Sequence, residues 1–334
     1  MARDRELLAP MLRALVLAAL VALGSIAPDW ATAQLLSGRP ITVIIPFMSG
    51  ASADTFQRLV AKKVTENTGQ IIVVESKPGA GGTVGAMAVK QAPPDGHTLL
   101  QGNSGTHAAN ASLYAALPYD PIRDFQPITL MWTFPHLLIV PADSPATSVS
   151  DLAALAKSRP GGLSFASQGN GSSGHLLGER FKMTTKAADM IHVPYRGAAP
   201  GMLDVATGRV DFFFVSYASA LPFIQSGKVR PLAIASAKRL PVLPKLPTMG
   251  ELGFKGFELD AWFGLFAPAG TPEDAITALH GAFARAVKDP EVVRHIEDQG
   301  TEAVTDTPEE FAAFIAAEVE RWGAIVRALG IKPD

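Results

Sequence analysis

The chain has 334 residues, a formal net charge of −2 at pH 7 and no cysteine. The absence of cysteine excludes disulfides, thiolate catalysis and cysteine-ligated zinc. Lysine and arginine are dispersed and nearly balanced by acids, so the charge gives no sign of a nucleic-acid partner. A length of this order suits two domains, each large enough to bury its own core.

Residues 1–33 have the composition of a secretory signal peptide. An apolar run from Leu15 to Ala27 follows Arg13 and is too short to cross a bilayer as a helix. Ala31 and Ala33 supply small residues at the spacing that a signal peptidase reads, which predicts cleavage after Ala33. The alternative is an uncleaved membrane anchor. We expect the mature chain to be released into the periplasm.

Short runs rich in valine and isoleucine alternate with segments of helical period along the rest of the chain. The first strand is expected at 41–45, and a helix with Phe56, Val60 and Val64 on one face follows it. Further strands are expected at 71–74, 98–101, 137–140, 163–166, 191–194, 210–215, 229–235 and 259–266. Strands that alternate with helices predict parallel α/β sheets, and this number divides naturally between two of them.

Proline marks two changes in the last third of the chain. The stretch 241–247 carries three prolines, which fit neither a helix nor a central strand, so it should run over the surface. Pro272 suits the first turn of a helix. From there the pattern predicts helices to the end of the chain, one ending near 287, one over 290–298 and one over 308–329.

Ligands of open α/β sheets bind beyond the carboxyl ends of the strands, so the loop after each strand is examined for chemistry. The loop after 41–45 is small and polar and opens directly into a helix. Its free backbone N–H groups and the helix dipole favour an anion. The alternative is that Ser52 only caps the helix. The candidate residues are Phe47, Ser49, Gly50, Ala51, Ser52 and Asp54.

Two later loops also carry hydroxyl groups. Ser104 and Thr106 can donate to a carboxylate, or either can be an ordinary helix cap. The loop after 163–166 contains the GxGxxG pattern of dinucleotide sites, but Asp189 lies before the next strand, where no ribose-binding acid belongs. A small anion nest is favoured over a nucleotide site. The candidates in this loop are Ser167, Asn170, Gly171 and Ser172.

The loops after 191–194 and 210–215 supply the last candidates. Arg196 can grip a carboxylate with two hydrogen bonds, or it can pair with an acid of the neighbouring domain. Simple helix capping is the alternative for Ser216. The candidates are Tyr195, Arg196, Gly197, Ala198, Ser216 and Tyr217.

Sequence motifs for metal binding and hydrolysis are missing. The seven histidines show no HxH or HExxH spacing, and there is no GxSxG elbow. The stretch 79–82 lacks the Gly-Lys-Ser/Thr ending of a phosphate loop and is interpreted as a structural turn. We therefore expect no metal, no cofactor and no catalytic residue. A secreted serine hydrolase and a dinucleotide enzyme are the weaker alternatives.

Several blocks of the sequence together resemble the Bug family of receptors for tripartite tricarboxylate transporters. They include PITVIIPFMSGASADTFQR, VVESKPGAGGTVGAMAV, HVPYRGAAPGMLDVATGRVDFFF and WFGLFAPAGTP, and the resemblance extends over about 39–329. It implies a type II periplasmic-binding-protein fold, with two α/β lobes joined by two crossing strands and a ligand cleft between them. Lobe 1 is expected to comprise 34–138 and 263–334, and lobe 2 the segment 139–262.

The resemblance also implies a function. The loop 47–54 would clasp one carboxylate, often through ordered water, and the lobe 2 loops would face the far end of the ligand. Lobe closure would then be read by a membrane permease, or alternatively by a membrane sensor kinase, and the receptor is expected to be a monomer that catalyses nothing.

Two departures from the family pattern bear on the ligand. Ser49-Gly50-Ala51 replaces the usual Pro-Gly-Gly, which alters the tightest part of the first clasp. Val215 occupies a position where members of the family often have an aspartate or asparagine, so the site is less suited to a ligand with an amino group, such as an amino acid. The expected ligand is a dicarboxylate or an aromatic carboxylate.

Overall fold

The computed structural model describes residues 36, 38–49, 52–187 and 189–331. The predicted signal peptide, residues 1–33, lies outside these ranges. Among the helices that are described, none combines the length and the apolar character needed to cross a membrane.

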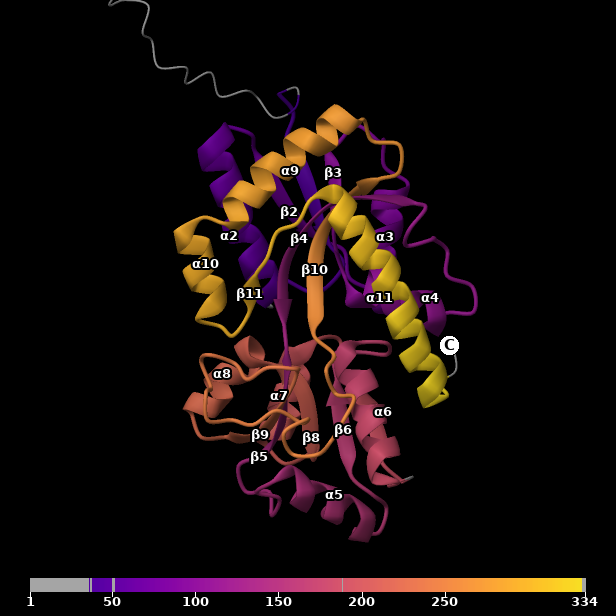
Figure 1. Cartoon of the computed structure of the whole chain (residues 1–334), viewed down its shortest axis with the longest axis vertical. Coiled ribbons are helices and arrows are strands. Elements are labelled where there is room, and N and C mark those ends of the chain that lie inside the picture. The colour runs from indigo at the N-terminus through magenta and orange to yellow at the C-terminus, as the bar shows by residue number, and fades with distance from the viewer. Residues whose placement is uncertain (1–35, 37, 50–51, 188, 332–334) are drawn as a thin grey trace, which may run out of the picture. The chain divides into compact units, whose positions relative to one another are not determined.

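The first sheet has six strands in the order β11-β4-β10-β3-β1-β2 (Figure 1). These strands are β1 (Ile41–Ile45), β2 (Ile72–Ser76), β3 (Thr98–Asn103), β4 (Phe125–Phe134), β10 (Ala261–Pro268) and β11 (Glu302–Ala303). Strand β1 pairs in parallel with β2 and β3, whereas β10 runs antiparallel to both β3 and β4. We call this sheet and its helices lobe 1.

Helices cover both faces of the lobe 1 sheet. They are α2 (Ser52–Thr68), α3 (Thr83–Lys90), α4 (Asn110–Leu113), α9 (Glu273–Val287), α10 (Pro290–Glu297) and α11 (Pro308–Leu329), with short turns η1 (Ala80–Gly82) and η2 (Gly105–Ala109). Apolar residues of α2, α9 and α10 pack with Val43 and Leu265, and those of α11 pack with Ile44 and Phe266. Side chains of one strand alternate between faces, so each strand contributes residues to two separate cores.

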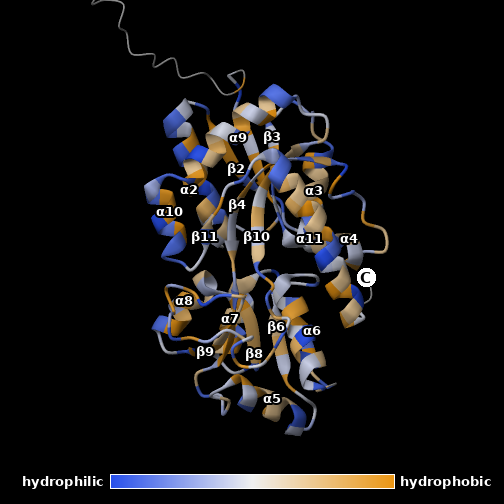
Figure 2. Ribbon diagram, viewed as in Figure 1, coloured by the Kyte–Doolittle hydropathy of each residue, from blue (hydrophilic) through white to orange (hydrophobic). Residues whose placement is uncertain are grey.

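The second sheet has five strands in the order β7-β6-β8-β5-β9. They are β5 (His136–Pro141), β6 (Ser164–Ser167), β7 (Ile191–Pro194), β8 (Phe212–Ser216) and β9 (Val229–Ala235), with helices α5 (Val149–Ser158), α6 (Ser173–Thr185), α7 (Ala198–Ala206) and α8 (Tyr217–Gln225). Figure 2 shows orange and blue residues side by side along the helices, as expected for amphipathic helices that cover a buried sheet. We call this half lobe 2.

The chain crosses between the sheets twice. Pro135 alone separates the end of β4 from the start of β5, and the return crossing leads into β10 at Ala261. These changes of sheet lie near the predicted lobe boundaries of 138 and 263, which stay a prediction. The expected fold class, two α/β lobes joined by two crossing strands, is confirmed.

Three expectations about the elements were wrong. The sheets are mixed rather than parallel, because β5 and β10 start at the edge where their neighbours β8 and β3 end. Strand β4 was not predicted, since Pro127 argues against a strand; in the structure Pro127 lies at a register shift opposite Phe266. The C-terminal part is not purely helical, because the two-residue strand β11 pairs with β4.

Candidate ligand-binding site

The strand ends that carry the candidate loops lie at one edge of each sheet. In lobe 2, Ser167 pairs with Pro194 and His136 pairs with Ser216, so the ends of β6, β7 and β8 share an edge with the start of β5. In lobe 1, β4 ends at Phe134. Because Pro135 links Phe134 to His136, the two edges adjoin.

Two glycines mark where loops of one lobe approach the other. A β-carbon at Gly171, in the lobe 2 loop after β6, would lie 2.5 Å from Cδ1 of Leu113 in α4. A β-carbon at Gly300, which follows α10, would lie 2.8 Å from Cδ1 of Tyr217. Both glycines have a left-handed backbone, with φ of 76° and 65°. The edges are therefore in close contact at two points where only glycine fits without a shift.

The first loop leads from β1 into α2. The ring of Phe47 is half-buried and meets Phe263 edge-on, with centroids 6.5 Å apart. Ser49 Oγ lies 2.6 Å from Ser76 Oγ at the end of β2. The buried carboxylate of Asp54 accepts a hydrogen bond from Arg58 Nε at 2.9 Å, so its charge is balanced within α2.

The other candidates of this loop are less defined. Ser52 is the first residue of α2, and Gly50 and Ala51 lie outside the described residues.

The second loop is held by a residue that the sequence analysis missed. Asn103 Oδ1 accepts the backbone N–H of Thr106 at 2.9 Å, and the Thr106 hydroxyl in turn lies 2.9 Å from Nδ1 of His107. Ser104 stands at the helix start and makes no capping bond through its side chain. Burial lowers the pKa of His107 to about 3, so this imidazole is neutral. Asn103 could have been found from its position, because it is the last residue of β3 and directly precedes the candidate loop.

The third loop rests on two histidines. The N–H of Gly171 donates to Nδ1 of His175 at 3.1 Å, and Ser167 Oγ lies 2.6 Å from Nε2 of His192. The two imidazoles stack with centroids 4.0 Å apart. Burial lowers the pKa of His192 to about 3, with added repulsion from His175 and Lys182.

The hydroxyl of Ser172 in the same loop caps α6 by accepting the N–H of His175 at 3.3 Å. Asn170 belongs to the turn just before it. The loop is thus a hydrogen-bonded turn that contacts the stacked imidazoles of His175 and His192.

The fourth loop presents the N-terminus of α7. Its N-cap is Gly197, with φ of 116°, and no side chain caps the helix. Free N–H groups of the first turn, starting at Ala198, therefore face outward with the positive end of the helix dipole. Arg196 is exposed, and none of the acidic side chains in the described ranges pairs with it. Within the described ranges, the alternative of an ion pair between Arg196 and an acid of lobe 1 is not found.

The hydroxyl of Tyr195 is engaged within lobe 2. It donates to Asp204 Oδ2 in α7 at 2.7 Å, and Arg209 Nη1 donates to the other oxygen at 3.2 Å. Burial, together with this hydrogen bond, raises the pKa of Tyr195 to about 12. The tyrosine hydroxyl therefore faces α7 and ties the loop to that helix.

The last two candidates begin α8. Ser216 caps this helix by accepting the N–H of Ser219 at 3.4 Å, so the capping interpretation applies to its hydroxyl. Tyr217 is buried and lies against Gly300 of lobe 1. Of the five candidate positions in lobe 2 that carry a hydroxyl group, Ser167, Ser172, Tyr195 and Ser216 use it within their own lobe.

Two serine–histidine pairs bear on the hydrolase alternative. Ser173 Oγ lies 2.8 Å from Nε2 of His136, and Ser167 pairs with His192 as described. Ser173 and His136 are both buried, and Nδ1 of His136 has no hydrogen-bond partner among the described residues. A triad needs an acid to orient the histidine, and no acid among the described residues bonds to His136 or His192. The described ranges also hold no group of three or more side chains suited to a metal ion.

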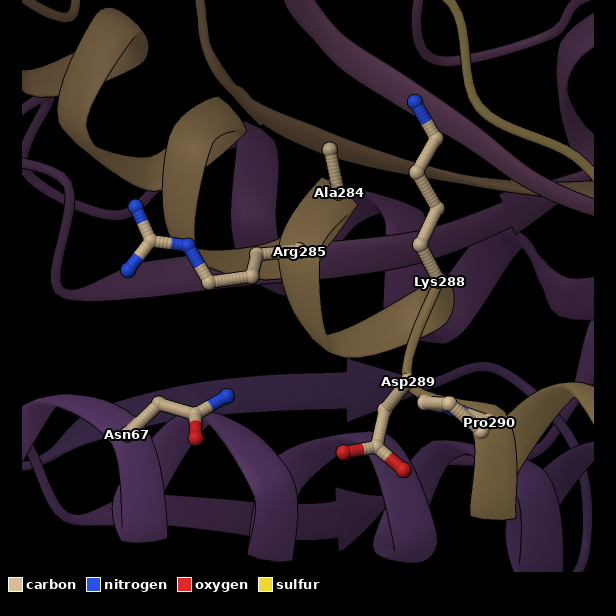
Figure 3. A pocket seen from close by; sticks show the side chains of 6 residues that line it. All are labelled: Asn67, Ala284, Arg285, Lys288, Asp289 and Pro290. Carbon is tan, nitrogen blue, oxygen red and sulfur yellow. The ribbon is translucent and has the colours of Figure 1, made fainter.

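Two cavities lie apart from the candidate loops. One of about 560 Å³ is lined by Asn67, Ala284, Arg285, Lys288, Asp289 and Pro290 (Figure 3). In it the ammonium group of Lys288 points away from Asn67 and Asp289. The other, of about 380 Å³, is lined by Glu179, Lys182, Met183, Lys186 and Leu329. Neither contains a candidate residue.

Comparison with known proteins shows the family to which the chain belongs. Residues 56–331 match the profile of the tripartite tricarboxylate transporter family receptor, TctC. The chain belongs to this family of solute-binding receptors, which confirms the resemblance found in the sequence.

Individual relatives are similar over nearly their whole length. Protein BugT of Bordetella pertussis is 35% identical over 302 residues, which covers 90% of this chain and 92% of the relative. A structure of R. palustris Rpa4515 with adipate has a TM-score of 0.85 and 35% identity, and covers 92% of this chain and 100% of that one. MatC from Rhodopseudomonas palustris with bound malate has a TM-score of 0.82 and 35% identity, and covers 87% and 100%.

Proposed function

We propose that this receptor binds a small organic carboxylate between its lobes, either a dicarboxylate or an aromatic carboxylate, and delivers it to a tripartite tricarboxylate-type membrane permease. The observation that carries the proposal is the uncapped N-terminus of α7 beside the unpaired Arg196. A helix N-terminus and a guanidinium group both favour an anion, and together they form a carboxylate site.

Relatives support the class of ligand. One is solved with adipate and another with malate, both small carboxylates. The site proposed here comprises the candidate loops of both lobes, with Phe47 to Asp54, Ser104 and Thr106 on lobe 1 and the loops at 167–172, 195–198 and 216–217 on lobe 2. Their roles in binding stay predictions.

The proposed mechanism is lobe closure without chemistry. A ligand that contacts both lobes favours the closed arrangement, because only there are all its contacts made. The permease would read that arrangement. We further propose that the receptor is a periplasmic monomer, freed by cleavage near Ala33, whose lobes divide at about 138 and 263.

Titration calorimetry of residues 34–334 against carboxylates tests this proposal. A carboxylate should bind and be recovered unchanged. Arg196→Gln should weaken binding by about tenfold, as expected for a lost charged hydrogen bond. Arg209→Gln is the matched control, since Arg209 is also an arginine of lobe 2 but is paired with Asp204. Consumption of an ester, or equal effects of the two substitutions, would contradict the proposal.

A further inference from the structure

Three phenylalanine rings form a continuous row at the edge of lobe 1. Phe134 and Phe263 stack with centroids 5.8 Å apart and planes 20° from parallel, and Phe47 meets Phe263 at 89°. The rings come from three separate places, the end of β4, the start of β10 and the loop after β1. We call Phe47, Phe134 and Phe263 the phenyl row.

The phenyl row extends toward lobe 2 and packs against other aromatic residues. The ring of His136, across the crossing residue Pro135, lies 5.5 Å from that of Phe134. Behind the row, Trp132 packs on Phe263 with centroids 5.9 Å apart. Phe263 is buried, whereas Phe47 and Phe134 are only half-buried. The exposed parts of these two rings therefore lie at the edge where the lobes adjoin.

The row supplies apolar surface and no ordinary hydrogen bonds. A hydroxylated ligand body placed against it would leave its hydroxyl groups without partners, which is costly in a closed site. An aromatic ring gains there instead, because it can stack on one phenyl ring and meet a perpendicular one edge-on. Phe134 lies within 20° of parallel to Phe263, and Phe47 is at 89° to Phe263, so the two half-buried rings, Phe47 and Phe134, are steeply inclined to each other and provide such a corner.

The charge of the candidate loops points to a single carboxylate. Arg196 is the only lysine or arginine in the candidate loops, so one carboxylate is matched by a full charge.

We infer that the phenyl row determines specificity and that the ligand is an aromatic carboxylate. This inference rests on the proposed function and narrows it. It assigns the row to the ligand's ring and Arg196 to its carboxylate.

The test is calorimetric titration of residues 34–334 with benzoate, cyclohexanecarboxylate, adipate and malate. Benzoate should bind about tenfold more tightly than cyclohexanecarboxylate, which has the same charge and carbon count but no flat ring, and more tightly than both aliphatic diacids. Phe134→Leu, which keeps an apolar side chain, should weaken benzoate binding about fivefold and leave adipate binding unchanged.

If Phe134→Leu fails to fold, as judged by circular dichroism, Phe47→Leu tests the same inference and should also weaken benzoate binding. Phe254→Leu is the matched control, because Phe254 is also half-buried but packs on Phe181 within lobe 2. If adipate or malate binds and benzoate does not, the proposed function stands and this inference is overturned. If no carboxylate binds, both fail. Loss of benzoate binding in Phe254→Leu equal to that in the row variants would also overturn it.

Discussion

The indole nitrogens of Trp262 and Trp322 donate to the same carboxylate oxygen, Oε2 of Glu318, at 2.9 and 2.7 Å. Arg321 Nη1 donates to the other oxygen at 3.0 Å. Glu318 is only 3% exposed. Since Trp262 belongs to the crossing strand β10 and the other residues to α11, this carboxylate fastens the return crossing to the C-terminal helix.

Glu318→Gln should lower the free energy of unfolding by about 2–3 kcal/mol, because hydrogen bonds to a charged group are replaced and the amide N–H₂ must face a donor, either the indoles or the Arg321 guanidinium group. Urea denaturation measures the change. Glu320→Gln, at an exposed position of the same helix, should shift stability by no more than about 0.5 kcal/mol. Equal effects of the two substitutions would show that the buried carboxylate contributes nothing specific.

The sequence predicted most strands because valine and isoleucine runs mark them, but it missed β4. Pro127 argued against a strand in the sequence. In the structure it is accommodated in β4 by a register shift against β10, a strand distant in sequence. The loops of the site were also predictable, because each follows a strand whose end can be recognised from nearby residues in the sequence. The engagement of Ser49 with Ser76 and of Tyr195 with Asp204 was not predictable, because it depends on which side chains the fold brings together.

Gly171→Ala should reduce ligand affinity at least about tenfold. The added β-carbon would lie 2.5 Å from Cδ1 of Leu113, so the loop after β6 could not approach α4 as closely. If lobe closure completes the site, a barrier to that approach penalises the bound state. Calorimetric titration with the best ligand of the carboxylate panel measures this.

Gly208→Ala is the control for backbone strain. Gly208 has φ of 70°, close to the 76° of Gly171, but a β-carbon there would meet nothing within 4 Å. Both variants should lose about 1 kcal/mol of stability from the left-handed backbone. Only Gly171→Ala should lose affinity; a similar loss in both would assign the effect to strain.

His136 should make stability depend on pH below neutrality. Burial lowers its pKa to about 3, whereas an unfolded histidine has a pKa near 6.5. Between these values the unfolded chain binds a proton that the folded chain does not, so stability falls as the pH falls, by up to about 1.4 kcal/mol per pH unit. Above pH 6.5 this contribution is constant.

Urea denaturation at pH 7.5 and 5.5 measures the loss in the parent chain and in His136→Gln. The loss should be smaller by about 1 kcal/mol in the variant, because one proton-linked group has been removed. Comparing the two chains cancels the contributions of the other groups. An identical pH dependence in both would mean that His136 is not held neutral in the folded state.

Tyr195→Phe separates a structural role of the hydroxyl from a ligand-binding one. The hydroxyl donates to Asp204, and its removal should lower the thermal midpoint because the loop before α7 loses its tie to that helix. Ligand affinity should stay within about twofold, since the ring is retained and Arg196 is untouched. A tenfold loss of affinity with an unchanged midpoint would instead place the hydroxyl against the ligand. Thermal unfolding and calorimetric titration on the same preparation distinguish the two roles.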